Sequence, residues 1–168
     1  SSHGLAEEMA LELGRGEILF GCLPTQRQAC MSRLFLILGD QLHPAPHPLL
    51  TDFNPASDRL LMVEASEEST HVWSHKARSA LFLAAMRHRA AAFRADGLPL
   101  DYLRLGEHAH PALADAVGAR LTSGDFRAVV MLEAGDYRVQ ESLRAVCSLH
   151  QTPLLIRPDP HFLCSLDE

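Results

Sequence analysis

Several features that commit a sequence to a particular class are scarce in this 168-residue chain. No apolar run approaches the ~20 residues needed to cross a bilayer, so no membrane segment is expected. Its 15 Lys and Arg are outnumbered by 21 Asp and Glu, and the formal net charge is −6. Nucleic-acid-binding surfaces usually carry a net basic field, so direct nucleic-acid binding is not expected either.

Cysteine is also sparse, and its spacing is uninformative for metals. The four cysteines form no C-x-x-C pair; they are Cys22, Cys30, Cys147 and Cys164. This spacing fits neither a zinc site nor a compact iron–sulfur run. Scattered thiols without a disulfide framework indicate a reducing compartment, and we expect a cytoplasmic protein.

The common catalytic and nucleotide-binding motifs are missing. No G-x-G-x-x-G follows the first predicted strand, and there is no P-loop, so a phosphate-cradling nucleotide site is not supported. There is no G-x-S-x-G, and no Ser/His/Asp or Cys/His set that spacing would single out. We therefore expect no catalysis from this chain alone.

The first 30 residues differ from the rest. They begin with Ser1-Ser2-His3-Gly4 and alternate apolar and acidic residues, and Met31 stands directly before a strong strand. A secretory signal peptide would begin basic and carry a longer apolar run. We interpret residues 1–30 as a leader or added extension outside the core, and residues 31–168 as one domain.

From residue 31 onward, apolar strands alternate with helical segments. The predicted strands are Leu34–Leu38, Leu60–Val63, Leu100–Leu105, Ala128–Leu132 and Leu154–Ile156, and the predicted helices are Ser66–Ala95, Pro111–Leu121 and Tyr137–His150. Most of the strands are apolar on both faces, which is typical of a buried parallel sheet. The sequence predicts an α/β fold: a Rossmann-like, doubly wound parallel sheet of about five strands with helices on both faces.

Two further segments carry local expectations. Ala80–Met86 is nearly all apolar, which predicts that the middle of the long helix is buried against the sheet. The Pro-rich segment Pro44–Pro55 is expected to be a surface loop.

Polar residues follow the strands at one edge of the predicted sheet, where parallel α/β sheets bind ligands. Gly39 and Asp40 follow the first strand, and Glu64 ends the second. Gly39 and Asp40 fit a ligand contact as well as an ordinary turn. A carboxylate that ends an apolar strand should face a cavity or a partner, so a functional role is favoured for Glu64.

The start of the long helix allows more than one interpretation. Ser66 followed by acidic residues is an ordinary helix N-terminus. Glu67, His71 and His75 are spaced four apart on one helix face, but they lack a fourth ligand, so no metal site is predicted. Phe82 is either a core residue or the wall of a pocket.

The motifs together resemble a known family. The matching segments are LILGDQL at 36–42, LLMVEASEESTHV at 60–72, SHKARSALFLAAMRH at 74–88, DYLRL at 101–105, EAGDYRV at 133–139 and IRPDPHFLCS at 156–165. They resemble the N-terminal domain of the photolyase-related proteins, which include prokaryotic (6-4) photolyases and iron–sulfur bacterial cryptochromes.

That resemblance implies an antenna domain. In several family members this domain holds 6,7-dimethyl-8-ribityllumazine, which absorbs light and passes the energy to FAD for light-dependent DNA repair or light sensing. FAD and the iron–sulfur cluster belong to a helical C-terminal region that begins after a segment like HFLCS. We therefore expect the chain to be truncated, with that flavin domain as its missing partner.

The resemblance also assigns site residues. Gly39 and Asp40 would lie under the chromophore, Glu64 and Glu68 would bond its ring or ribityl chain, and Phe82 would help wall the pocket. Two alternatives stay open. One is a ligand-free structural or protein-interaction fragment; the other is a small enzyme using Glu64 and Glu68 as acid and base.

Overall fold

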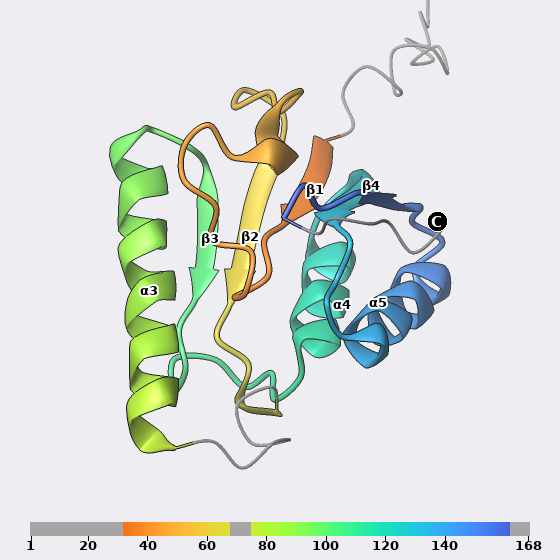
Figure 1. Ribbon diagram of the computed structural model, residues 1–168. Helices are drawn as coiled ribbons and strands as arrows, with labels where there is room; N and C mark the ends of the chain where they lie inside the picture. The colour runs from red at the N-terminus through yellow and green to blue at the C-terminus, as the bar shows by residue number, and fades with distance from the viewer. Residues whose placement is uncertain (1–31, 68–74, 162–168) are drawn as a thin grey trace, which may run out of the picture.

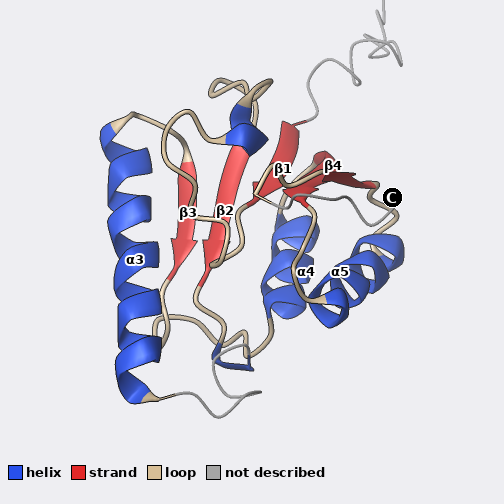
Figure 2. Ribbon diagram, in the orientation of Figure 1, coloured by secondary structure: helices blue, strands red, loops and turns tan. Residues whose placement is uncertain are grey.

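Five parallel strands form the centre of the molecule, whose computed structural model describes residues 32–67 and 75–161. The strands are β1 (Ser32–Leu36), β2 (Arg59–Val63), β3 (Leu100–Leu103), β4 (Phe126–Leu132) and β5 (Leu154–Arg157). The helices are α3 (Lys76–Ala95), α4 (Leu113–Ser123) and α5 (Tyr137–Leu149), with a 3-10 turn η1 (Pro48–Leu50). Figures 1 and 2 show the sheet between α3 and the α4–α5 pair. The predicted α/β fold is confirmed.

The order of the strands is β3-β2-β1-β4-β5, and every neighbouring pair is parallel. The chain winds outward from β1 to β3, then returns to the centre and winds the other way through β4 and β5. β1 and β4 are therefore neighbours at the point where the winding reverses, with Leu36 opposite Met131. Sheets of this kind bind ligands beyond the carboxyl ends of the strands at this reversal point.

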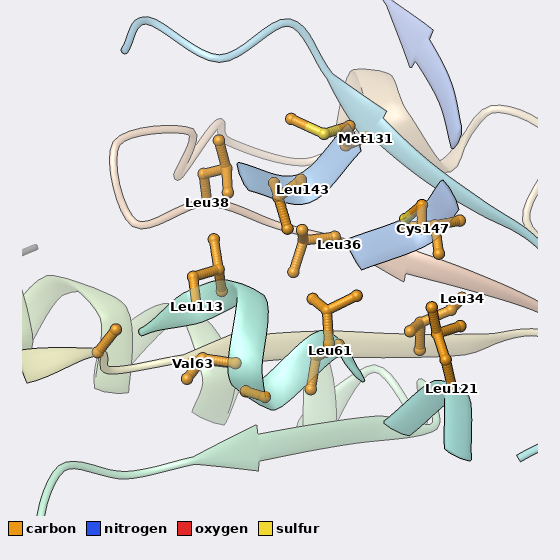
Figure 3. Close-up of a cluster of buried hydrophobic side chains, with 14 of the residues drawn as sticks. Leu34, Leu36, Leu38, Leu61, Val63, Leu113, Leu121, Met131, Leu143 and Cys147 are labelled. Atoms are coloured by element: carbon orange, nitrogen blue, oxygen red, sulfur yellow. The ribbon is translucent and has the colours of Figure 1, made fainter. Parts of the chain in front are cut away.

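Successive side chains of the central strands point to opposite faces of the sheet and fill two cores. Leu34 and Leu36 of β1 pack with α4 and α5, a cluster that also includes Leu143 and Cys147 (Figure 3). Phe35 of β1 points the other way, into a cluster that contains residues of α3 and η1. Both faces are thus covered, which explains why the central strands are apolar throughout.

α3 differs from the predicted long helix in two respects. His75 has an extended backbone (φ −62°, ψ 136°) and caps the helix by accepting a hydrogen bond from the Ala77 amide. A single helix over 66–95 is therefore wrong, because the helix that covers the sheet begins at Lys76. The predicted burial of Ala80–Met86 is also wrong: Leu81 is 72% exposed, and within that stretch only Met86 is buried.

The Pro-rich segment 44–55 is more than a surface loop. It contains η1, whose Leu49 is fully buried against the sheet, and His47, which is 4% exposed. Leu42, Leu50 and Phe53 also pack on this core. The segment covers the part of the sheet face that α3 leaves open. The prediction of a surface loop, which was based on its prolines, therefore missed its buried residues. None of the described helices is both long and apolar enough to span a membrane.

Candidate functional site

A cavity of about 580 Å³ lies beyond the carboxyl ends of β1 and β4. Its walls come from five parts of the described chain: the ends of β1 and β4, Glu67 in the segment after β2, the first turns of α5, one face of α3, and the start of α4. The lining residues are Leu38, Gly39, Asp40, Glu67, Arg78, Phe82, Ala112, Leu113, Ala134, Gly135, Asp136, Arg138, Val139 and Ser142. The cavity therefore occupies the position that the strand order favours for a ligand, and its volume suits a small organic molecule.

Gly39 lets the aromatic wall approach the end of β1. A Cβ atom built on Gly39 would lie 2.5 Å from Cζ and 2.8 Å from Cε1 of Phe82, and 3.0 Å from Sδ of Met86. Real Cβ contacts are longer, so any larger residue requires the Phe82 ring to move. Gly39 and Phe82 consequently set the shape of this wall together.

Replacing Gly39 with alanine should reshape the cavity without unfolding the domain. Phe82 is 40% exposed, so its ring can swing outward, and we expect a stability loss of about 1–3 kcal/mol from the forced repacking. The free energy of ligand binding at the cavity should weaken by more than the free energy of unfolding falls. Thermal unfolding and a crystal structure of Gly39→Ala would check this, and an unmoved Phe82 ring would contradict it.

Carboxylates lie on the strand-end side of the cavity. The pKa of Asp40 is raised, mainly because the carboxyl is desolvated and further because Asp159 and Asp136 are near. Asp136 is the N-cap of α5: its carboxylate accepts hydrogen bonds from the amide of Arg138 (2.9 Å) and from that residue's guanidinium (2.7 and 3.2 Å). The lining thus has three carboxylates: Asp136, which is already paired, Asp40, which is exposed, and Glu67.

Glu64 lies outside the cavity lining and is held by three groups. Arg87 donates to both carboxylate oxygens (2.8 and 2.9 Å), the Leu105 amide donates at 2.9 Å, and the Tyr102 hydroxyl donates as well. The Glu64 side chain has no exposed surface. Burial alone would raise the pKa of Glu64, but these hydrogen bonds outweigh burial and lower it to about 2. The arrangement joins α3 to the ends of β2 and β3.

Comparison with known proteins identifies the family of this chain. A family model described as deoxyribodipyrimidine photo-lyase-related protein matches residues 35–168. The chain belongs to this photolyase-related family. A (6-4) photolyase of Agrobacterium fabrum is 29% identical over 147 residues, which cover 82% of this chain and 27% of that protein. The chain therefore spans about a quarter of the length of this curated relative.

In this photolyase-related chain, three of the five predicted site residues come together. Gly39, Asp40 and Phe82 line the same cavity. Glu64 lies one residue beyond its strand but turns to Arg87, so a ligand contact would require its carboxylate to leave its partners. Glu68 lies outside the described residues.

Other cavity residues of the photolyase-related domain were missed in the sequence. Arg78 reads as one of several solvated arginines, yet it lies one helical turn before Phe82 and lines the cavity with it. The spacing of four residues between Arg78 and Phe82, which puts both on one helix face, was the sequence signal that could have identified Arg78. Asp136 and Arg138 also line the cavity. Within residues 32–67 and 75–161, no three His, Cys, Asp or Glu side chains are arranged to hold a metal ion.

Proposed function

We propose that this chain is the chromophore-binding antenna domain of a photolyase- or cryptochrome-type flavoprotein, with 6,7-dimethyl-8-ribityllumazine as its ligand. The observation that carries the proposal is the cavity at the reversal point of a photolyase-related sheet, lined by Gly39, Asp40 and Phe82. Family membership supports a photolyase- or cryptochrome-type role. The identity of the chromophore as a lumazine is the more specific part of the proposal.

The residues present suit such a ligand. Phe82 offers an aromatic surface that an aromatic ring can pack against, and Asp40 offers acceptor oxygens for ribityl hydroxyls. Leu38, Leu113 and Val139 add apolar surface against which the ring can pack. When bound, the chromophore supplies light absorption and energy transfer; the protein's own residues bind and orient it.

The remaining functions are proposed to reside outside this chain. FAD, an iron–sulfur cluster and lesion binding would belong to a C-terminal flavin region that acts as the partner of this domain. Light-dependent DNA repair or light sensing in the cytoplasm would be the activity of the two parts together. In this proposal the domain contributes the chromophore-binding site, and the catalytic step belongs to the flavin region.

Lumazine titration tests the proposal directly. Adding the protein to 6,7-dimethyl-8-ribityllumazine should change the fluorescence of the ligand saturably, because the ring leaves water for an aromatic-walled cavity. Phe82→Ala should weaken binding about three- to tenfold, which corresponds to roughly 0.5–1.5 kcal/mol for one lost aromatic contact. The measurement is the dissociation constant.

Leu81→Ala is the matched control for this experiment. Leu81 neighbours Phe82 on α3, is 72% exposed and lies outside the cavity lining. The control should bind lumazine like the wild type. Fluorescence that stays unchanged at saturating protein would overturn the proposal, and equal losses in both variants would indicate a general effect on the helix.

A second candidate function rests on exposed apolar side chains. Leu81 and Tyr137 are 72% and 71% exposed, and they neighbour cavity residues Phe82 and Asp136 in the chain. Contiguous exposed apolar patches mark protein contacts, whereas single exposed apolar side chains are common on any surface, so these two residues favour this candidate less than the cavity favours the first. A ligand-free interaction fragment would self-associate or bind a partner here, whereas a concentration-independent monomer in sedimentation velocity would count against it.

A further inference from the structure

α3 has an apolar face that points away from the sheet. Its buried side chains, Met86, Ala90 and Phe93, contact the core, and none of the other described helices lies beside it (Figure 1). With about 3.6 residues per turn, the opposite face carries residues three or four positions apart. These residues are all exposed and form the outer face of α3: Ala77, Ala80, Leu81, Ala84, His88, Ala91 and Ala95.

α5 shows what a water-facing helix of this domain looks like. Its exposed residues include several charged and hydroxyl side chains: Arg138, Glu141, Ser142, Arg144 and Ser148. The outer face of α3 has His88 as its one polar member. Alanine favours helices, so a few exposed alanines need no explanation. A helix that is apolar on two opposite faces is instead typical of one that is covered on both sides.

The borders of the outer face are basic. α3 contains no Asp or Glu, although the whole chain has a net charge of −6. By their positions in the helix, Lys76, Arg87 and Arg94 follow one border, and Arg78 and Arg89 follow the other. A second copy of α3 would bring like charges together. The surface therefore suits a partner that is apolar along its centre and acidic at its edges.

The beginning of the same chain has this composition. The sequence LAEEMALEL starts at Leu5 and contains three Glu and no Lys or Arg. Leu5, Met9 and Leu13 are four residues apart, so a helical conformation puts them on one face. Glu8 and Glu12 border that face in the same conformation. This N-terminal segment thus matches the outer face of α3 in both charge and apolar pattern.

The N-terminal segment can reach α3. Ser32 begins β1 and Ala95 ends α3 at the same edge of the sheet, because the helix runs antiparallel to the strands (Figure 1). Crossing two strand spacings and the width of the helix from Ser32 requires on the order of 30 Å. Residues 14–31 can span up to about 60 Å when extended. The connection is therefore long enough.

We propose that the N-terminal segment, residues 5–13, docks as a helix on the outer face of α3 of its own chain. Its apolar residues would contact the alanines and Leu81, and its glutamates would lie near the basic borders. Small side chains on α3 allow the two helix axes to approach closely. The tether raises the effective concentration of the segment, so weak contacts suffice. This proposal goes beyond chromophore binding and does not depend on it.

Hydroxyl-radical footprinting of the full chain tests the docking. Leu81 on α3 and Leu149 on α5 are the same residue type and are 72% and 79% exposed in the described part of the chain. If the segment covers α3, Leu81 should be labelled at least about threefold more slowly than Leu149, because it is protected while the segment is bound. Met9→Asp should bring the two labelling rates together, since it places a charge in the apolar face of the segment.

Two further variants locate the contact. Ala84→Glu places a carboxylate in the centre of the outer face and should also remove the protection of Leu81. Ala145→Glu is the matched control, because Ala145 is an exposed alanine on α5, and it should keep the protection. Equal labelling of Leu81 and Leu149 in the wild type overturns the proposal. Protection that survives Met9→Asp, or that disappears on dilution, overturns it as well and indicates another occupant.

Discussion

Replacing Glu64 with alanine should lower the free energy of unfolding by about 2–4 kcal/mol. The side chain is fully buried, and its removal leaves the Tyr102 hydroxyl and the Leu105 amide without their acceptor. A buried donor that loses its partner costs about 1–3 kcal/mol. Arg87 is 43% exposed, so water can solvate its charge after the loss and adds little to this cost. Urea unfolding would measure the change.

Glu133 provides the control for this variant. It follows β4 as Glu64 follows β2, yet within the described chain its side chain makes no hydrogen bond or ion pair. Glu133→Ala should therefore change stability by no more than about 0.5 kcal/mol. Equal effects of the two substitutions would contradict the role assigned to the Glu64 hydrogen bonds.

Acid should remove the same contribution. The pKa of Glu64 in the folded protein, about 2, lies below the ordinary value of 4.5. A carboxyl with a lowered pKa stabilises the fold fully above its unfolded pKa. The stabilisation from Glu64 should therefore be complete above about pH 4.5 and be lost as the pH falls toward 2.

His47 should make stability depend on pH in a higher window. Burial is the main reason that its pKa falls from 6.5 to about 4, and the electrostatic interactions with His43 and Arg89 lower it further. The imidazole is neutral in the fold: the Leu49 amide donates to Nδ1 (3.2 Å), so Nε2 carries the proton and donates to the Gln41 carbonyl (2.9 Å). Protonation would break the first of these hydrogen bonds.

The sign follows from the lowered pKa of His47. Below pH 6.5 the unfolded chain binds a proton that the folded chain refuses, so stability is full above 6.5 and falls until about pH 4. The loss should amount to about 3 kcal/mol over this window. Unfolding measured at intervals from pH 7.5 to 4 would show it.

His47→Asn should flatten the stability profile between pH 6.5 and 4. Asparagine keeps a side-chain acceptor for the Leu49 amide but cannot take up a proton. His88→Asn removes one exposed histidine and is the control, which should retain the wild-type profile. A wild-type profile in His47→Asn would show that another group causes the pH dependence.

Local pattern was enough to predict the sheet. The central strands are apolar on both faces because α3 and η1 cover one side and α4 and α5 the other. Gly39, Asp40 and Phe82 could be assigned to one site because the first two follow a strand and the third matches a family motif. Their meeting at one cavity depends on the strand order.

What the sequence could not show depends on contacts between distant segments. Arg87 reads as one more exposed arginine, and only the fold brings it to Glu64, 23 positions away. His47 lies in a Pro-rich segment that looks like a surface loop. In the fold this segment packs on the part of the sheet face that α3 does not cover, and His47 is buried there. Leu81 falls in an apolar run but points to solvent, because α3 contacts the sheet through Met86, Ala90 and Phe93.

The crystal structure of the chain with 6,7-dimethyl-8-ribityllumazine tests the central claim most directly. We predict ligand density beyond the ends of β1 and β4, with its ring in contact with Phe82 and its nearest strand-end neighbours at Gly39 and Asp40. Density at any other surface, or a cavity that stays empty at saturating lumazine, would contradict the proposal that this photolyase-related domain is a chromophore antenna.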